Sequence, residues 1–441
     1  MNALLTDLYQ LTMAAGYVQA GKTKDRATFE MFVRRMPYNR NFFLVAGLEQ
    51  AVDYILNLRF NKDEIDYLRG LGQFKNAPAE FFETLAGFRF SGDVFAVPEG
   101  TPVFAGEPFF TVRAPLIEAQ LLETYLLSMI GFQTSIATKA ARVAETAASA
   151  GVVEFGSRRA HSPAAGVLGG RAAYIGGCIG TSNVETGFRY GVPVFGTAAH
   201  SWVMSFPDEL TAFDQLQKLL GEDTVYLIDS YDTLQGARHA ASLGKPMWGV
   251  RLDSGNLLEL ARAVRHILDD AGFPEAKIMA TGDLNEYRIL EMVAAGAPID
   301  AYGVGTELAT SADCPALGAV YKLVELEERG VKRYTAKFSA DKKTMPGAKQ
   351  IFRYKTHDEV ACEWECPAGD GEALLRPVIL GGELVDTLPK LEQIRTYAAA
   401  ALKRLPRVCR SLYGAEETWQ VKYSPKLLAL EAQVRQEMAA K

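Results

Sequence analysis

The sequence predicts an α/β protein built around a (β/α) barrel. Between about residues 151 and 330, short apolar runs rich in β-branched residues recur every 20–40 residues or so. Each run is followed by a polar or glycine-rich cluster and then by a helical pattern, which is typical of parallel strands with crossover helices. No GxGxxG motif follows the first run, which disfavours a dinucleotide-binding open sheet. The seven runs cover residues 152–155, 192–195, 225–228, 247–250, 278–280, 301–304 and 319–324.

The segment before this region mixes short strands and helices, and we expect it to form a first domain over residues 1–130. Alternating apolar positions and Gly/Pro turns predict strands, whereas longer apolar periodicities predict helices. The predicted strands cover residues 27–34, 88–97 and 102–113, and the predicted helices 48–58, 63–71 and 117–130. An Ala-rich helix over 135–150 leads into the barrel domain, residues 131–330.

The last part of the chain, residues 331–441, changes pattern again. Strands over 332–340 and 350–354 flank the turn MPGAK, which indicates an antiparallel pair. A charged helical tail follows from residue 389, and its stretch 427–438 is amphipathic. We expect this portion to pack back on the first domain.

The composition excludes several classes of protein. Of 441 residues, 48% are hydrophobic and 23% charged, which is ordinary for a globular protein and excludes a disordered chain, a fibre or a coiled coil. The net charge of -6 gives no general attraction to nucleic acid. No apolar stretch approaches the roughly 18 residues of a membrane span, and Asp7 lies where a signal peptide is basic. Five scattered cysteines suit a reducing compartment, so we expect a cytoplasmic protein that binds neither nucleic acid nor membrane.

Polar groups gather just past the predicted barrel strands, where (β/α) barrels carry their active sites. Six consecutive runs are followed by charged or phosphate-compatible residues, which indicates an enzyme. These are Gly156, Arg158, Arg159 and His161; Gly196, Thr197, His200 and Ser201; Asp229, Tyr231 and Asp232; Arg251, Asp253, Ser254 and Gly255; Thr281, Gly282 and Asp283; and Gly303, Gly305 and Thr306.

These groups suit one kind of ligand. Glycine turns such as residues 303–306 can point backbone N–H groups at a phosphate, and arginines such as Arg158 and Arg251 can bind phosphate or carboxylate oxygens in a fork. Carboxylates such as Asp229 and Asp253 can hold ribose hydroxyls or Mg²⁺. The set predicts a phosphorylated sugar with a pyrophosphate group and a divalent cation.

The chain resembles the nicotinate phosphoribosyltransferase family over nearly its whole length. The resemblance is carried, in order, by TDLYQLTM (6–13), EFGSRRAHSP (154–163), GGCIGTSNVETG (176–187), GTAAHSWV (196–203), IDSYDT (228–233), VRLDSGNL (250–257), ATGDLNEYRI (280–289), YGVGTELATS (302–311), LGAVYKLVE (317–325) and KTMPGAKQIFR (343–353). It implies the type II phosphoribosyltransferase fold, an N-terminal α/β sandwich with an incomplete (β/α) barrel, in a homodimer. The implied reaction joins nicotinate to phosphoribosyl pyrophosphate, with Mg²⁺ as cofactor and ATP as co-substrate.

The resemblance also implies roles for individual residues. His200 is the histidine that ATP phosphorylates, and Arg251, Asp229 and Asp253 complete the catalytic set, the two aspartates on the side of the magnesium–pyrophosphate. Phe155 and the partner subunit's Tyr9 hold the pyridine ring between them. The other implied substrate-binding residues are Arg158, Thr181, Ser182, Gly282, Asp283, Gly303, Gly305 and Thr306. Without the resemblance, Phe155 reads as a barrel-core residue and His200 as a packed, hydrogen-bonded histidine.

One position of the sequence bears on the choice between nicotinate and nicotinamide. Nicotinamide phosphoribosyltransferases share this fold but carry an aspartate in the segment corresponding to GTSNV, where this chain has Ser182. An aspartate accepts a hydrogen bond from a carboxamide and repels a carboxylate, so Ser182 favours nicotinate. Nicotinamide use, a phosphate-binding lyase or isomerase, and a non-catalytic dimeric binding protein are the alternatives. The residues left without a role are His161, Arg159, Glu307, Lys337, Lys343 and Lys349.

Overall fold

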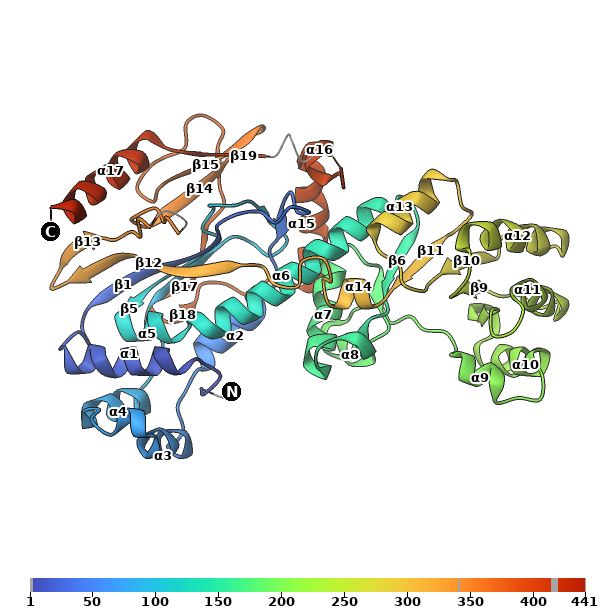
Figure 1. The fold of residues 1–441 in the computed structure, drawn as a ribbon, viewed down its shortest axis with the longest axis horizontal. Helices are drawn as coiled ribbons and strands as arrows, with labels where there is room; N and C mark the ends of the chain where they lie inside the picture. The colour runs from blue at the N-terminus through green and yellow to red at the C-terminus, as the bar shows by residue number, and fades with distance from the viewer. Residues whose placement is uncertain (1–2, 340–341, 414–418, 441) are drawn as a thin grey trace. The chain divides into compact units, whose positions relative to one another are not determined.

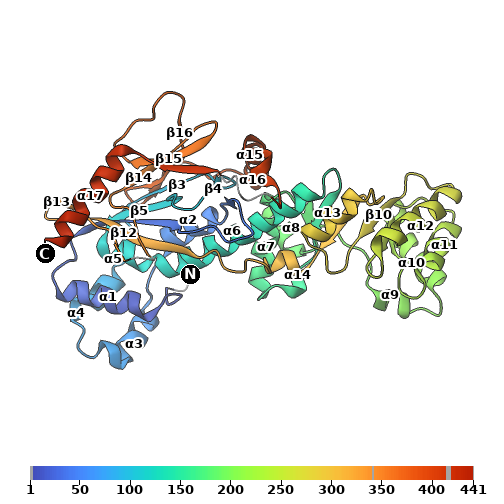
Figure 2. The same ribbon diagram turned by 45° about the horizontal axis from the view of Figure 1, so that its top comes forward.

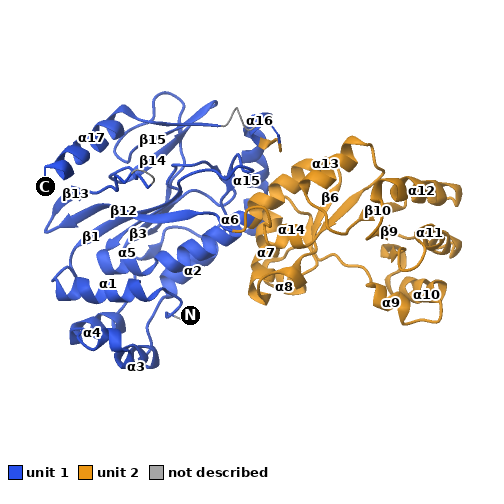
Figure 3. Ribbon diagram, in the orientation of Figure 1, with its two compact units in different colours: residues 1–135, 316–409, 413–441 blue, residues 136–315, 410–412 orange. Residues whose placement is uncertain are grey.

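The computed structural model describes residues 3–339, 342–413 and 419–440. The chain forms two compact units (Figure 3): unit 1 contains residues 1–135, 316–409 and 413–441, and unit 2 contains residues 136–315 and 410–412. The expected domain boundaries at residues 130 and 330 therefore move to 135 and 315. Almost all of the C-terminal portion after residue 331 groups with the N-terminal residues in unit 1.

Unit 2 is built on a six-stranded sheet in which every described pair of neighbours is parallel. The strand order is β7-β6-β11-β10-β9-β8, and Val194 adds a parallel bridge to Thr181 at the β7 edge. Because β11 pairs with β6, the sheet follows chain order around a ring that is open between residue 194 and β8. The strands are β6 (Gly151–Glu154), β7 (Gly180–Thr181), β8 (Val225–Leu227), β9 (Gly249–Leu252), β10 (Lys277–Ala280) and β11 (Ala301–Val304).

The prediction of a seventh barrel strand at residues 319–324 is wrong. This run lies in β12 (Ala319–Glu328), which pairs antiparallel with β1 (Arg26–Val33) in unit 1. Tyr321 of β12 stacks on Phe29 of β1, with ring centroids 4.9 Å apart. Lys322 and Glu325 interrupt the apolar residues, as in a strand of an antiparallel sheet rather than the continuous apolar run of a buried parallel strand.

The helices of unit 2 begin at capping side chains that end the turns after the strands. Ser162, Asn183, Asp232, Asn256 and Asn285 each accept a hydrogen bond from a backbone N–H in the first turn of the next helix. α11 and α12 lie beside β9 (Figure 1), and the two helices pack against each other (Figure 2). The helices are α7 (Pro163–Ile175), α8 (Val184–Tyr190), α9 (His200–Met204), α10 (Glu209–Leu220), α11 (Thr233–Ser242), α12 (Leu257–Asp270), α13 (Glu286–Ala294) and α14 (Thr306–Ala309), with 3-10 turns Ser157–Arg159 and Gly221–Asp223.

Unit 1 contains a seven-stranded sheet in the order β13-β12-β1-β5-β3-β17-β18, in which all described pairs are antiparallel. A four-stranded sheet, β16-β14-β15-β19, and the pair β2-β4 complete it. The remaining strands are β2 (Phe43–Leu44), β3 (Asp93–Ala96), β4 (Pro102–Val103), β5 (Phe110–Pro115), β13 (Val331–Tyr334), β14 (Lys349–Arg353), β15 (His357–Cys362), β16 (Glu372–Ala373), β17 (Arg376–Leu380), β18 (Glu383–Leu384) and β19 (Gln420–Tyr423).

Helices cover these sheets. In the four-stranded part, Leu427, Leu430 and Val434 of α17 form a core with Val360 and Cys362 of β15 (Figure 1). The helices of unit 1 are α1 (Leu8–Gln19), α2 (Leu48–Asn57), α3 (Lys62–Gly70), α4 (Ala79–Ala86), α5 (Leu116–Leu121), α15 (Leu391–Arg404), α17 (Pro425–Ala439) and a 3-10 turn, Gly72–Phe74. Two helices cross the unit boundary, α6 (Glu123–Thr146) and α16 (Arg407–Arg410).

Two predicted helices have different bounds in the structure. The predicted helices over 117–130 and 135–150 are instead the short α5 and the continuous α6. No proline interrupts the α6 sequence, and its Gly131 is tolerated within the helix. No described helix is both long enough and apolar enough to cross a membrane.

Candidate active site

A cavity of about 600 Å³ lies at the carboxyl ends of the parallel strands of unit 2. Its walls come from the turns after β6, β7, β9, β10 and β11 and from the segment that leads into α9. Parallel strands place these turns on one edge of the sheet, which is why residues far apart in sequence meet there. The lining residues are Phe155, Arg158, Arg159, Ser182, Gly196, Thr197, Ala198, Ala199, His200, Arg251, Asp253, Thr281, Gly282, Asp283, Gly303, Gly305 and Thr306.

Most of the predicted site residues line this cavity. Three do not. Asp229 and Thr181 lie behind the lining, and Tyr9 lies on α1 of unit 1 with 48% of its surface exposed. Of the residues left without a role, Arg159 lines the cavity, whereas His161 is exposed and is absent from the described lining.

His200 is the first residue of α9, and its ring has a polar neighbour on each side. Nδ1 lies 3.2 Å from Ser230 Oγ, and Nε2 lies 3.6 Å from Asp253 Oδ2. The side chain is 40% exposed, so an incoming group can reach the ring. A histidine held on one nitrogen by a hydroxyl has an oriented second nitrogen, as a nucleophile or a general base requires.

Arg251 projects from β9 and is mostly buried. Its Nη1 donates to Thr197 Oγ1 at 2.5 Å, and its Nη2 lies 4.0 Å from Asp253 Oδ1. Burial lowers the pKa of Arg251, and Asp253 and Asp229 oppose this shift. Its buried Nε has no hydrogen-bond partner among the described residues. A guanidinium held in place in this way is ready to bind an anion.

Asp229 supports Asp253 from behind the lining. Its Oδ2 accepts hydrogen bonds from the Asp253 backbone N–H at 3.0 Å and from Ser254 Oγ at 2.6 Å. Thr281 donates to Asp253 Oδ1, so the Asp253 carboxylate is held by the neighbouring strand as well. The other oxygen of Asp229, Oδ1, is buried without a partner in the described structure. An acceptor left open beside Asp253 suits a cation or a ligand hydroxyl.

Phe155 and Ser182 follow β6 and β7, and Glu154 fixes both turns. The buried Glu154 carboxylate accepts from Thr181 Oγ1 at 2.6 Å and from the Gly156 backbone N–H. Burial raises the pKa of Glu154, and these two hydrogen bonds oppose the shift. The Thr181 hydroxyl is therefore committed to Glu154, while Ser182 reaches the cavity. Glu154 was not singled out from the sequence, although an acidic residue ending a buried apolar run is the available signal.

Two glycines allow neighbouring segments of the cavity lining to pack closely against each other. Gly282 has φ +93, and a Cβ there would overlap the Asp253 carbonyl oxygen. A Cβ at Gly303 would lie 2.6 Å from the Phe155 ring. The turns after β9 and β10 can therefore lie close together only because Gly282 has no side chain. The Phe155 ring can lie against Gly303 for the same reason.

Glu307 points to a cation rather than into the cavity. It follows the 303–306 turn, where an anion would repel phosphate, but its Oε2 lies 3.4 Å from Lys139 Nζ on α6. Glu307 is absent from the described cavity lining. Glu307 therefore adds no carboxylate to the cavity beside the backbone N–H groups of this turn.

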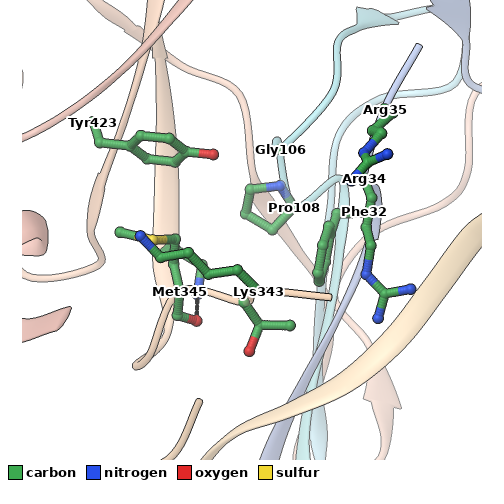
Figure 4. Close-up of a pocket in the computed structure, with 10 residues that line it drawn as sticks. Phe32, Arg34, Arg35, Gly106, Pro108, Lys343, Met345 and Tyr423 are labelled. Carbon is green, nitrogen blue, oxygen red and sulfur yellow. Dashed lines mark hydrogen bonds between the residues drawn. The ribbon is translucent and has the colours of Figure 1, made fainter. Parts of the chain in front are cut away.

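A second cavity, of about 190 Å³, lies within unit 1 and is rich in basic side chains (Figure 4). Arg34, Arg35 and Lys343 line it, but only Lys343 was considered from the sequence. Lys349 also borders it but is committed elsewhere: its ammonium lies 2.7 Å from Glu30 Oε2 and donates to the Met345 and Gly347 carbonyls. The remaining lining residues are Phe32, Gly106, Pro108, Thr344, Met345 and Tyr423. Lys337 is absent from the described lining.

The parallel sheet and its cavity of arginines, aspartates and glycine turns define an α/β enzyme that handles phosphorylated substrates. Residues 4–131 match the model described as the nicotinate phosphoribosyltransferase (NAPRTase) N-terminal domain, and residues 151–342 match the nicotinate phosphoribosyltransferase (NAPRTase) family model. The chain belongs to the nicotinate phosphoribosyltransferase family.

Individual relatives agree with this assignment. A nicotinate phosphoribosyltransferase of Mycobacterium tuberculosis is 41% identical over 99% of this chain and 94% of its own. The enzyme of that name from Bacillus subtilis is 45% identical over 80% of this chain and 73% of its own. The crystal structure of human nicotinic acid phosphoribosyltransferase superposes with a TM-score of 0.81 at 29% identity, covering 98% of this chain and 100% of that one. The predicted fold class is confirmed.

Proposed function

We propose that the protein transfers the phosphoribosyl group of phosphoribosyl pyrophosphate to nicotinate, in the cytoplasm and as a step of NAD biosynthesis. A bond forms between the pyridine nitrogen and the ribose C1, and the bond from C1 to pyrophosphate breaks. The products are nicotinate mononucleotide and pyrophosphate. The observation that carries the proposal is that one cavity joins the Phe155 ring, Arg158 and Arg251, Asp253 and two glycine turns.

The lining suggests how each part of the substrates is held. The pyridine ring packs on Phe155, and its carboxylate pairs with Arg158 beside the neutral Ser182. The backbone N–H groups of the turns at Gly282 and at Gly303–Gly305 receive the 5′-phosphate. Positive charge develops on the ribose ring as pyrophosphate leaves, and a carboxylate such as Asp253 stabilises such charge.

The acidic residues fit Mg²⁺ as part of a complex with the substrate. Asp229 and Asp253 offer the oxygen ligands that Mg²⁺ prefers, and the buried Asp229 Oδ1 has no hydrogen-bond partner among the described residues. No group of three or more His, Cys, Asp or Glu side chains suited to a metal occurs in the described residues. The remaining ligands would be pyrophosphate oxygens and water. Bound there, the ion supplies charge neutralisation for the departing pyrophosphate.

We also propose that ATP hydrolysis is coupled through His200. The Nε2 lone pair attacks the γ-phosphorus, the N–P bond forms, and the P–O bond to ADP breaks; water later releases phosphate. Ser230 holds Nδ1, which keeps Nε2 as the reacting nitrogen. The His200→Ala variant should lose ATP stimulation and the acid-labile phosphoenzyme while it keeps basal transfer. Undiminished ATP stimulation in this variant would overturn the role.

A homodimer with Tyr9 across the interface completes the proposal. Tyr9 is exposed on α1 beside the exposed Leu5, Leu8 and Met13, an apolar surface that suits burial against a second chain. Mixing a Tyr9→Ala chain with an Asp253→Asn chain tests it. If the partner supplies Tyr9, mixed dimers contain one intact site and regain activity that neither variant shows alone. No recovery in a mixture shown to exchange subunits would contradict this arrangement.

The central test is a product assay with nicotinate, phosphoribosyl pyrophosphate and Mg²⁺, with and without ATP. Nicotinate-dependent release of pyrophosphate and formation of the mononucleotide, increased by ATP, is the expected result. Nicotinamide at the same concentration is the matched substrate control. The absence of lysine from the described cavity lining disfavours a Schiff-base lyase. Failure of both pyridine substrates would instead favour a non-catalytic binding protein.

A further inference from the structure

A buried lysine in unit 2 takes no part in the proposed chemistry. Lys139, on α6, is 1% exposed, and its ammonium contacts three carboxylates. Nζ lies 2.6 Å from Glu286 Oε2, 2.9 Å from Asp313 Oδ1 and 3.4 Å from Glu307 Oε2. Arg142, one turn along α6, binds the other oxygen of Glu286 through Nε at 3.0 Å. So deep a cluster of charges is costly to bury unless its geometry is well satisfied.

Two of these carboxylates lie directly beyond the turns that line the cavity. Glu286 is the first residue of α13 and follows the turn that contains Thr281, Gly282 and Asp283. Glu307 is the second residue of α14 and follows the turn that contains Gly303 and Gly305. A single ammonium group therefore joins the ends of both glycine turns. The chain between each carboxylate and its turn is only a few residues long, so a shift at Lys139 is transmitted to the cavity wall.

We propose that Lys139 is a positioning residue that sets the spacing of the two glycine turns for the phosphoribosyl group. The inference rests on the proposed function, because it assumes that these turns receive phosphoribosyl pyrophosphate. Backbone N–H groups bind a phosphate well only when they converge on it, and misplacement by about 1 Å can reduce activity by about 100-fold. Ion pairs shielded from water hold such a spacing better than exposed ones.

The chain offers a matched pair of variants. Glu307 and Asp313 pair with the same ammonium, and their side chains are 33% and 23% exposed, so neither substitution opens a core. Only Glu307 adjoins a cavity turn; Asp313 lies beyond the end of α14. Glu307→Gln and Asp313→Asn each keep the size of the side chain and remove its charge. If the cluster served folding stability alone, Asp313→Asn should lower the free energy of unfolding more than Glu307→Gln, because the Asp313 ion pair is the shorter of the two.

The experiment measures the Kd of phosphoribosyl pyrophosphate by calorimetry and the steady-state kinetics of the full-length chain. Glu307→Gln should raise the Kd and KM for phosphoribosyl pyrophosphate about five-fold or more, with the KM for nicotinate within about two-fold. Asp313→Asn should leave both within about two-fold. Lys139→Met should raise the phosphoribosyl pyrophosphate Kd further, with folding checked by circular dichroism. An unchanged Kd in Glu307→Gln, or an equal rise in Asp313→Asn, would overturn the proposal.

The outcomes separate this inference from the proposed function. A wild-type protein that binds phosphoribosyl pyrophosphate but makes no nucleotide from nicotinate would contradict the function, while the comparison of Kd values would still test Lys139. A wild-type protein that does not bind phosphoribosyl pyrophosphate would overturn both. Loss of nicotinate affinity alone in Lys139→Met would contradict the assignment to the glycine turns.

Discussion

His200 has a hydroxyl beside one ring nitrogen and a carboxylate beside the other. Ser230 Oγ lies 3.2 Å from Nδ1, and Asp253 Oδ2 lies 3.6 Å from Nε2, so the two contacts together orient the ring. The sequence drew attention to His200 because it follows the second predicted barrel strand and lies in the segment GTAAHSWV, which carries part of the family resemblance. It offered no reason to select Ser230, which the fold places against the ring from the turn after β8.

We predict that Ser230→Ala slows phosphoenzyme formation by about 10-fold or more, because the imidazole loses its orienting partner. Acid-labile phosphate incorporated from ATP in a single turnover measures the effect. Ser205→Ala is the control, since Ser205 caps the end of α9 and, within the described structure, its Oγ donates to the backbone carbonyl of Trp202. A phosphorylation rate equal to that of the unmodified chain would show that Ser230 does not orient the ring.

Ser182 lines the cavity, and it is the residue on which we expect the choice between nicotinate and nicotinamide to depend. We predict that Ser182→Asp shifts the ratio of kcat/KM for nicotinamide over nicotinate upward by about 10–100-fold. A new carboxylate repels the acid and accepts from the amide. Steady-state kinetics with both substrates measure the shift, and Ser182→Asn separates the effect of charge from that of size. A preference that does not move would place the carboxylate of nicotinate elsewhere in the cavity.

At the scale of elements, the turns after the strands are shaped by glycine and by helix caps. Gly282 and Gly296 both have positive φ, +93 and +65, but only a Cβ at Gly282 would meet other atoms, those of the Asp253 backbone. A Cβ at Gly296 would have no described atom within 4 Å. The two positions therefore separate the cost of backbone conformation from the cost of displacing the Asp253 turn.

We predict that Gly282→Ala reduces kcat/KM by about 100-fold or more, because it pushes apart the turns after β9 and β10. Gly296→Ala should lower the free energy of unfolding by about 1–2 kcal/mol, the cost of left-handed backbone for alanine, with kcat/KM unchanged. Urea denaturation and steady-state kinetics of both variants make the comparison. Equal activity in the two would show that the close approach at Gly282 is not needed for function.

At the scale of the whole molecule, stability depends on buried charges as well as on apolar packing. In unit 1, Arg353 binds Asp358 through Nε at 2.9 Å and Nη2 at 2.6 Å, and the buried Glu107 faces the same aspartate. Burial raises the pKa of Glu107 well above its ordinary value, and the Asp358 carboxylate raises it further. Relative to the unfolded chain, the folded protein therefore favours the protonated form of Glu107.

This shift predicts a pH dependence of folding. A raised pKa in the folded state means that the stabilising contribution is complete below the ordinary pKa of Glu and is lost as the pH rises through the folded pKa. The loss from this group proceeds at up to about 1.4 kcal/mol per pH unit. Glu107→Gln should remove this pH dependence, because the amide stays neutral and its oxygen can still accept from the Phe104 N–H.

Urea denaturation from pH 5 to pH 9 measures how the free energy of unfolding depends on pH. The substitution Glu80→Gln, at an exposed position, controls for the loss of one negative charge. If Glu107→Gln and the unmodified chain show parallel stability curves across that range, Glu107 is not the group responsible.

Much of this protein follows from local pattern. Six of the seven apolar runs are strands or a bridge of the parallel sheet, because buried parallel strands need continuous apolar residues and their crossover helices impose the spacing. Polar residues after those strands predicted the cavity, and most of its lining was named from the sequence, including Phe155, His200 and Arg251. The family resemblance came from ten ordered segments rather than from any single residue.

The rest depends on pairing between distant segments and on side-chain direction. Residues 319–324 pair with β1, which lies hundreds of residues away in the sequence. An apolar run does not specify which distant strand it will pair with. Asp229 and Asp253 are chemically alike, yet only Asp253 lines the cavity as described, while Asp229 accepts a hydrogen bond from the Asp253 backbone. Likewise, Thr181 donates to Glu154, whereas its neighbour Ser182 lines the cavity. Glu307 likewise points toward Lys139, because a buried ammonium group attracts a carboxylate. Lys139 lies on a helix 168 residues away in the sequence, so the local pattern around Glu307 does not reveal this partner.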